Sequence, residues 1–240
     1  MHFILISGAW HGAWCWERVA ALLEAKGHRV QAPDLRGMGA DRTPLAAVSF
    51  QDWATAVARV ARASGEPVVL VGHSRGGIVV SQAAELAPEA IHTSVYLAAA
   101  LVPDGLRMAD VFATARTDPA VAAGVRLRAD GVSTDLDPAL LPTHFYNTTP
   151  PELLARAISR LTPEPVFSNA AVMQLSPEKF GRVRRAYVEC LQNRCVPIEL
   201  QRKMQDALPC QHVGVLDTDH SPFYSAPEAL AEALIAAAPA

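Results

Sequence analysis

The chain has 240 residues, of which 50% are hydrophobic and 19% charged, so it can bury the core of one large domain, with or without an insertion. A formal net charge of −3 gives no electrostatic reason to expect nucleic acid or an anionic membrane as a partner. The four cysteines form no CxxC pair and no zinc-like cluster, and no apolar stretch approaches the ~20 residues of a membrane span. The N-terminal apolar run is too short for a signal peptide, and we expect a cytoplasmic protein.

Short apolar runs alternate with segments of helical periodicity over most of the chain. In chain order, the first half predicts strands at 3–6, 28–32, 68–71 and 93–98, and helices at 14–26, 52–63 and 78–86. The C-terminal part predicts strands at 183–190 and 212–216, and helices at 199–207 and 226–237. This alternation is typical of the α/β class, with a mostly parallel sheet flanked by helices on both faces.

The alternation breaks between residues 106 and 182. This stretch is richer in Pro, Thr and Asp, and its helical pieces are short. We therefore predict a core made of residues 1–105 and 183–240, with residues 106–182 inserted as a helical lid.

The sequence VGHSRGG at residues 71–77 carries the main chemical motif. Gly72-x-Ser74-x-Gly76 follows a predicted strand and precedes a predicted helix, as in the nucleophile elbow of serine hydrolases. The sharp turn needs its glycines because strand and helix approach closely, and it exposes the Ser74 hydroxyl near a helix N-terminus that favours negative charge.

The other catalytic groups are predicted from their places around the sheet. His220 lies between the last strand and the last helix, where α/β proteins with a nucleophile elbow carry their general base. The N–H of Arg75, next to the nucleophile, and the N–H of Ala9, in the loop after the first strand, are the candidate oxyanion donors.

With these motifs in place, the chain resembles the α/β-hydrolase superfamily nearly end to end. The resemblance rests on GAWHGAWCWERVAALLEAKGHRVQAPDLRGMG, VLVGHSRGG, VYLAAALVPDG, FYNTTPPELLARAISRLTPEP and DTDHSPFYSAPEAL, which are similar to the branch of plant methylesterases, hydroxynitrile lyases and bacterial esterase relatives. It implies a Ser-His-acid mechanism on a small carboxylic ester, without metal or cofactor. The lyases carry threonine and lysine where this chain has Gly8 and Ser221, so the esterases are favoured. Ser7-Gly8 also departs from the His-Gly usual in the family.

Aromatic and apolar side chains of the predicted lid are candidates for substrate contacts. Together with one residue of the oxyanion loop, the set expected to line a pocket is Trp10, His144, Phe145, Tyr146, Phe167 and Met173. Packing within the lid is the alternative role for the lid residues.

The acid of the triad is the open question. In CLQNRCVP, Asn193 stands at the position of the family's aspartate. Its carbonyl oxygen could accept a hydrogen bond from His220, but an amide supplies no charge. Asp104, after the fourth strand, and Glu189, within the strand before Asn193, are the alternative acids.

Three interpretations stay open on this evidence. The chain is a slow esterase that uses Asn193, an esterase whose acid lies elsewhere, or a hydrolase fold that binds a ligand or performs a non-hydrolytic biosynthetic step. A homodimer also remains an open alternative.

Overall fold

A parallel sheet of six strands forms the centre of the molecule. The computed structural model describes residues 1–116 and 118–238. Neighbouring strands run β2-β1-β3-β4-β8-β9, and every pairing is parallel. Their bounds are β1 His2–Ile6, β2 Arg29–Gln31, β3 Val68–His73, β4 Ile91–Leu97, β8 Arg184–Cys190 and β9 His212–Leu216. This is the α/β-hydrolase architecture that the sequence predicts, and the strand positions agree within a few residues.

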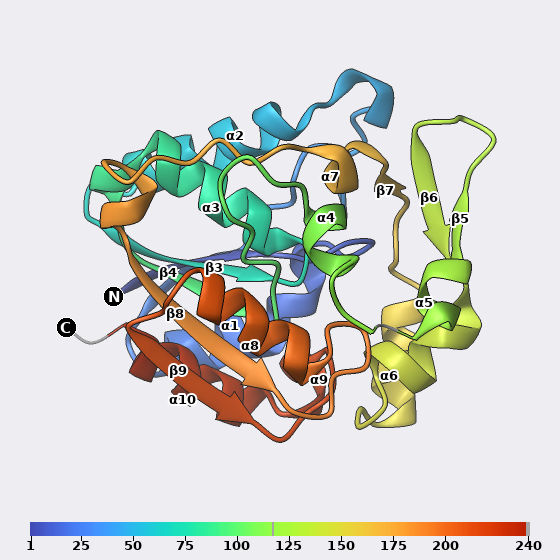
Figure 1. The fold of residues 1–240 in the computed structure, drawn as a ribbon. Coiled ribbons are helices and arrows are strands. Elements are labelled where there is room, and N and C mark those ends of the chain that lie inside the picture. The colour runs from blue at the N-terminus through green and yellow to red at the C-terminus, as the bar shows by residue number, and fades with distance from the viewer. Residues whose placement is uncertain (117, 239–240) are drawn as a thin grey trace.

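Helices cover both faces of this sheet, as Figure 1 shows, with α2 and α3 on one side and α10 on the other. The main helices are α1 Glu17–Ala25, α2 Phe50–Ala63, α3 Gly76–Leu86, α8 Ile198–Ala207 and α10 Pro227–Ala237. Helix α2 begins at a capping box, in which Ser49 and Asp52 satisfy each other's backbone N–H. Strands β1 and β3 are buried along their whole length, as expected for a parallel sheet covered on both faces.

Most of the segment between β4 and β8 lies beyond the carboxyl ends of the strands, and its last part runs back past α3 to the start of β8 (Figure 1). It contains α4 Met108–Phe112, α5 Pro119–Ala123, α6 Pro151–Ile158 and α7 Phe167–Ala170, and a further short helix, α9 Pro222–Ser225, precedes α10. The same segment forms an antiparallel sheet of β5 Val125–Leu127, β6 Ser133–Leu136 and β7 Glu164–Pro165. The insertion thus contains the expected helices and, in addition, a small sheet that was not predicted, because strands this short show no readable alternation.

Short 3₁₀ turns and a π-helical turn connect these elements in the part of the chain that the structure describes. The 3₁₀ turns are Ala13–Trp16, Leu45–Ala47, Pro88–Ala90, Pro138–Leu140 and Phe180–Arg182, and the π-helical turn is Leu141–Phe145. Within the described ranges, no helix combines the length and apolar character needed to cross a membrane.

Candidate active site

Ser74 occupies a strained turn between β3 and α3. Its φ of 52° lies in the left-handed region, which a non-glycine residue adopts only when its surroundings demand it. A Cβ on Gly72 would lie 2.7 Å from the carbonyl oxygen of Gly76, and one on Gly76 would lie 2.9 Å from the carbonyl oxygen of Ile6. Both glycines are therefore required for the close approach of β1, β3 and α3 that presents the Ser74 hydroxyl.

Two residues beside Ser74 supply the backbone N–H groups expected to bind an oxyanion. Ala9 lies in the loop after β1, and Arg75 follows the nucleophile, and both residues line one pocket with Ser74. Among the described residues, neither N–H has a hydrogen-bond acceptor. Trp10, the neighbour of Ala9, has a φ of 60°, so this loop is also held in the left-handed region. These two N–H groups are available to a developing oxyanion.

His220 lies in the loop between β9 and α9 and is buried. Its Nδ1 is 2.9 Å from the amide nitrogen Nδ2 of Asn193. The amide oxygen Oδ1 of Asn193 accepts hydrogen bonds from the backbone N–H groups of Cys195 and Val196, each at 2.9 Å. Exchanging the amide oxygen and nitrogen would set the NH₂ group against two N–H donors, so this amide orientation is the one that satisfies every group.

The orientation of Asn193 determines where His220 carries its proton. An amide NH₂ only donates, so Nδ1 of His220 must be the unprotonated, accepting nitrogen. Burial and, to a smaller extent, the nearby His11 lower the pKa of His220 to about 3, so the ring is neutral at neutral pH. The neutral ring then has its proton on Nε2, the nitrogen that a general base needs free to accept the serine proton. The described residues contain no hydrogen bond between the side chains of Ser74 and His220.

Two more buried histidines stand beside His220. The rings of His73 and His220 have centroids 4.6 Å apart, and those of His11 and His73 are 6.2 Å apart. Nε2 of His73 donates to the carbonyl oxygen of His220, and Nε2 of His11 lies 2.5 Å from the hydroxyl of Tyr146. Burial lowers the pKa of His11 to about 4 and that of His73 well below its usual range. The rings of His11 and His73, beside His220, are therefore neutral at neutral pH.

Neither alternative acid contacts His220. Asp104 accepts a hydrogen bond from the N–H of Leu175 at 2.7 Å. It lies at a surface hollow beside residues 175–181, in the loop that leads to β8. Glu189 is paired with Arg202 at 3.1 Å, because it points to the α8 side of β8. The proposal that Asp104 or Glu189 orients His220 is therefore incorrect for this structure. Asn193 is the residue that touches Nδ1.

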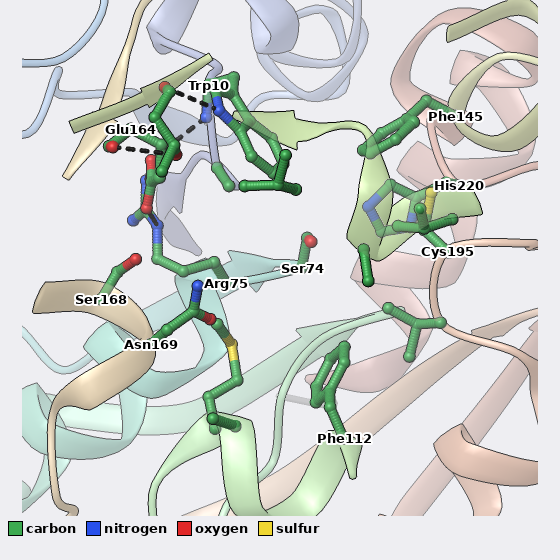
Figure 2. A pocket seen from close by; sticks show the side chains of 18 of the residues that line it. Trp10, Ser74, Arg75, Phe112, Phe145, Glu164, Ser168, Asn169, Cys195 and His220 are labelled. Carbon is green, nitrogen blue, oxygen red and sulfur yellow. Dashed lines mark hydrogen bonds and ion pairs between the residues drawn. The ribbon is translucent and has the colours of Figure 1, made fainter. Parts of the chain in front are cut away.

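A pocket of 390 Å³ contains Ser74 and His220. Figure 2 shows the Ser74 hydroxyl between Arg75 and Glu164 on one side and His220, Cys195 and Phe145 on the other. Most of the remaining wall is apolar and comes from the insertion, namely Met108, Ala109, Phe112, Ala113, Val121, Ala122 and Val125, and Val196 also contributes. The pocket therefore suits an apolar group attached to a reacting carbonyl.

Of the six residues expected to contact substrate, Trp10 and Phe145 line the pocket. The other four do not. His144 lies 3.1 Å from Asp118, Tyr146 bonds to His11, and the ring of Phe167 packs on Trp53 at 4.8 Å. Met173 is buried, and its carbonyl oxygen accepts a hydrogen bond from the N–H of Gly105. Tyr146, Phe167 and Met173 thus take the packing role that the sequence left open, and His144 makes a polar contact with Asp118.

Sequence reasoning missed one charged part of the wall. The guanidinium of Arg75 pairs with Glu164, the first residue of β7, at 2.8 Å, and both side chains are almost fully buried. Glu164 stands between prolines in TPEPVF, with no periodicity or motif to mark it. Cys195 and Phe112 were also not predicted, because pocket contacts made across the fold leave no local signal.

The fold and the site combine an α/β sheet, a strained serine at a strand-to-helix turn, two backbone N–H groups beside it and a buried histidine, as in serine hydrolases. Residues 3–233 match the model of the alpha/beta hydrolase family. The chain is 34% identical over 245 residues to putative methylesterase 11, chloroplastic, of Arabidopsis thaliana, which covers 98% of this chain. It spans only 63% of the length of that relative.

Two further proteins align over nearly their whole length. Esterase PIR7B of Oryza sativa subsp. japonica is 35% identical over 262 residues, covering 98% of this chain and 94% of the rice protein. The structure of tomato methylketone synthase I complexed with 2-tridecanone has a TM-score of 0.87 and 27% identity, covering 98% of this chain and 96% of that one. The chain belongs to the alpha/beta hydrolase family.

Proposed function

We propose that this protein hydrolyses a small carboxylic ester through an acyl-enzyme on Ser74. The observation that carries the proposal is the strained Ser74 on a pocket that also contains His220 and two unoccupied N–H donors. Similarity to esterase PIR7B and to methylesterase 11 supports an ester as substrate. The apolar pocket wall supports an ester with an apolar acyl or alcohol group.

The reaction follows from the roles of these groups. Oγ of Ser74 attacks the carbonyl carbon and its proton passes to Nε2 of His220, while the N–H groups of Ala9 and Arg75 bind the oxyanion. His220 returns the proton to the departing alcohol as the C–O bond of the ester breaks. A water molecule then attacks the acyl-enzyme by the same route and releases the acid.

Asn193 makes the first step slow. For Nε2 to accept, the proton of His220 must move to Nδ1, and the Asn193 amide must turn its oxygen towards the ring. This breaks its bonds with the N–H groups of Cys195 and Val196. Leaving two buried donors unsatisfied costs roughly 2–6 kcal/mol, which corresponds to a rate lower by a factor of roughly 30 to 10⁴.

The test is hydrolysis of aryl esters with short and medium acyl chains by the purified protein, beside Ser74→Ala. A slow, saturable rate that disappears in Ser74→Ala is the expected result. If the two proteins equal the buffer blank at every acyl length, the proposal fails. Covalent labelling of Ser74 by an alkyl phosphonate gives an independent readout of the nucleophile.

A second candidate function is favoured by the position of the His220 proton. A neutral imidazole that donates from Nε2 is suited to hydrogen-bond a ligand carbonyl without any role for Ser74. Tomato methylketone synthase I, a structural relative, is known in complex with the ketone 2-tridecanone. Calorimetric binding of 2-tridecanone that is as tight in Ser74→Ala as in the wild type, together with absent esterase activity, would favour this non-hydrolytic role.

A further inference from the structure

Two charged side chains in the pocket wall have no role in the reaction just described. The side chains of Arg75 and Glu164 are 1% and 3% exposed, and Nε of Arg75 lies 2.8 Å from Oε1 of Glu164. The guanidinium also stacks on the ring of Trp53, with Cζ 4.4 Å from the ring centroid. A buried ion pair pays a large desolvation penalty and is weak evidence for stability, so another function has to account for it.

The contacts of this pair lead to the oxyanion loop. Nη2 of Arg75 donates to the carbonyl oxygen of Gly8 at 3.0 Å. That carbonyl and the N–H of Ala9 belong to the same peptide group, and in a trans peptide they point in opposite directions. Holding the Gly8 oxygen therefore sets the direction of the Ala9 N–H, the first oxyanion donor.

The next peptide of the loop is held by the partner of Arg75. Oε2 of Glu164 accepts a hydrogen bond from the N–H of Trp10 at 3.2 Å. Trp10 has a φ of 60°, a conformation that costs on the order of 1–3 kcal/mol and persists only under outside restraint. The ion pair thus anchors the peptides on both sides of Ala9, and the backbone of Arg75 supplies the second oxyanion donor.

We infer that Arg75 and Glu164 are positioning residues that hold the oxyanion loop in its reactive conformation. The inference rests on the proposed ester hydrolysis and names the side chains that prepare its transition-state binding. Glu164 belongs to β7 of the insertion, so the insertion also contributes to the geometry of the donors. The pair acts where charge develops, so its removal lowers kcat more than it changes KM.

Two variants test this inference. Glu164→Gln keeps the shape of the side chain, but its amide has one accepting oxygen where the carboxylate has two. It therefore cannot accept hydrogen bonds from both Arg75 and Trp10 as Glu164 does. The double variant Arg75→Met with Glu164→Leu removes both charges and leaves neither unpaired, which buried pairs tolerate best. We expect kcat to fall 10- to 1000-fold in both variants, as for loss of an oxyanion donor, with KM within about threefold. The melting midpoint should stay unchanged in the double variant and fall in Glu164→Gln, which leaves the buried Arg75 cation without its partner. Phosphonate labelling of Ser74 should slow in parallel.

Glu189→Gln is the matched control, because Glu189 is also buried and arginine-paired but lies away from the pocket. It should leave kcat unchanged. The inference is overturned if the two pocket variants keep the wild-type kcat, or if kcat falls only as far as the folded fraction does.

A readout without turnover separates this inference from the proposed function. Hydrogen exchange of the Trp10 amide, followed by NMR, should accelerate at least tenfold in Glu164→Gln but not in Glu189→Gln. If the wild type hydrolyses no ester, the proposed function fails, and an accelerated Trp10 amide still supports the anchoring of the loop. Unchanged exchange in Glu164→Gln contradicts the anchoring whatever the activity.

Discussion

The amide nitrogen of Asn193 lies 2.9 Å from Nδ1 of His220, while the oxygen of the same amide accepts two backbone N–H groups. A carboxylate in this place would accept the same two N–H groups with one oxygen and the Nδ1–H of His220 with the other. The loop is therefore shaped for an aspartate, and the asparagine reverses one hydrogen bond. In the proposed mechanism, that reversal, and no displacement of the chain, weakens the base.

Replacing Asn193 by Asp should raise esterase activity. The carboxylate moves the His220 proton to Nδ1 and stabilises the imidazolium, so we expect kcat/KM to rise roughly 10²- to 10⁴-fold. Steady-state hydrolysis of an aryl ester by the variant and the wild type measures this change in kcat/KM. The carboxylate also raises the pKa of His220. The Asn193→Asp rate should therefore decline as pH falls through that raised pKa, whereas the wild-type rate stays level.

Asn169→Asp is the control for this gain, because Asn169 also lines the pocket but lies on the side of Arg75, away from His220 (Figure 2). Asn169→Asp should produce no increase in kcat/KM. An Asn193→Asp protein that is folded and no faster than the wild type would contradict the assigned role of Asn193.

A side chain at Gly8 should damage the site. A Cβ there would lie 2.8 Å from Nδ1 of His73 and 2.9 Å from Cβ of Ser74, both in packed surroundings. We expect Gly8→Ala to destabilise the fold by about 1–3 kcal/mol and to reduce kcat at least tenfold, measured by urea unfolding and ester hydrolysis. Gly214→Ala is the control, since its Cβ would meet nothing closer than 3.8 Å. Equal behaviour of the two variants would disprove the steric argument.

The insertion should set the acyl length that the pocket accepts. Phe112 of α4 lines the pocket below Ser74 in Figure 2. Phe112→Ala enlarges the cavity, so the ratio of kcat/KM for an octanoyl over an acetyl ester should rise about tenfold, which corresponds to about 1.4 kcal/mol of apolar contact. Leu127→Ala, at a side chain that is 65% exposed on β5, should leave the ratio unchanged. A ratio that stays constant in Phe112→Ala would mean that the acyl group binds elsewhere.

Acid should destabilise the fold through its buried histidines. The pKa values of His11 and His220 are lowered to about 4 and about 3, and that of His73 is also lowered. The unfolded chain takes up these protons near pH 6.5 and the folded chain does not, so stability is full above pH 6.5 and falls below it. Each histidine contributes about 1.4 kcal/mol per pH unit. Urea unfolding should therefore show a loss of about 4 kcal/mol between pH 7.5 and 5.5.

The contribution of one histidine can be isolated. His11→Gln should reduce the pH dependence by about a third, and His92→Gln, at an exposed position of β4, should not alter it. A free energy of unfolding that stays constant between pH 7.5 and 5.5 would show that the folded protein accommodates the protonated rings.

Most of the fold was readable because its signals are local. The apolar runs at β1, β3 and β4 each mark a buried strand, and the glycines of the elbow mark a turn that needs no side chain there. The strands β5–β7 escaped prediction because each is too short to show a readable alternation of apolar and polar residues. The sequence also could not tell which of two neighbouring aromatic residues lines the pocket. Phe145 does so, whereas the hydroxyl of Tyr146 bonds to His11.

The sequence by itself determined the α/β core, the nucleophile turn at Ser74 and the place of His220, because periodicity and glycine spacing are properties of consecutive residues. Only the tertiary structure decided that Asn193, and neither Asp104 nor Glu189, meets His220, and that Glu164 reaches the oxyanion loop. Those outcomes depend on which side chains the packed sheet and insertion bring within about 3 Å, the range in which a hydrogen bond acts. The direction of one amide, determined by two backbone N–H groups, then decides which nitrogen of His220 carries the proton.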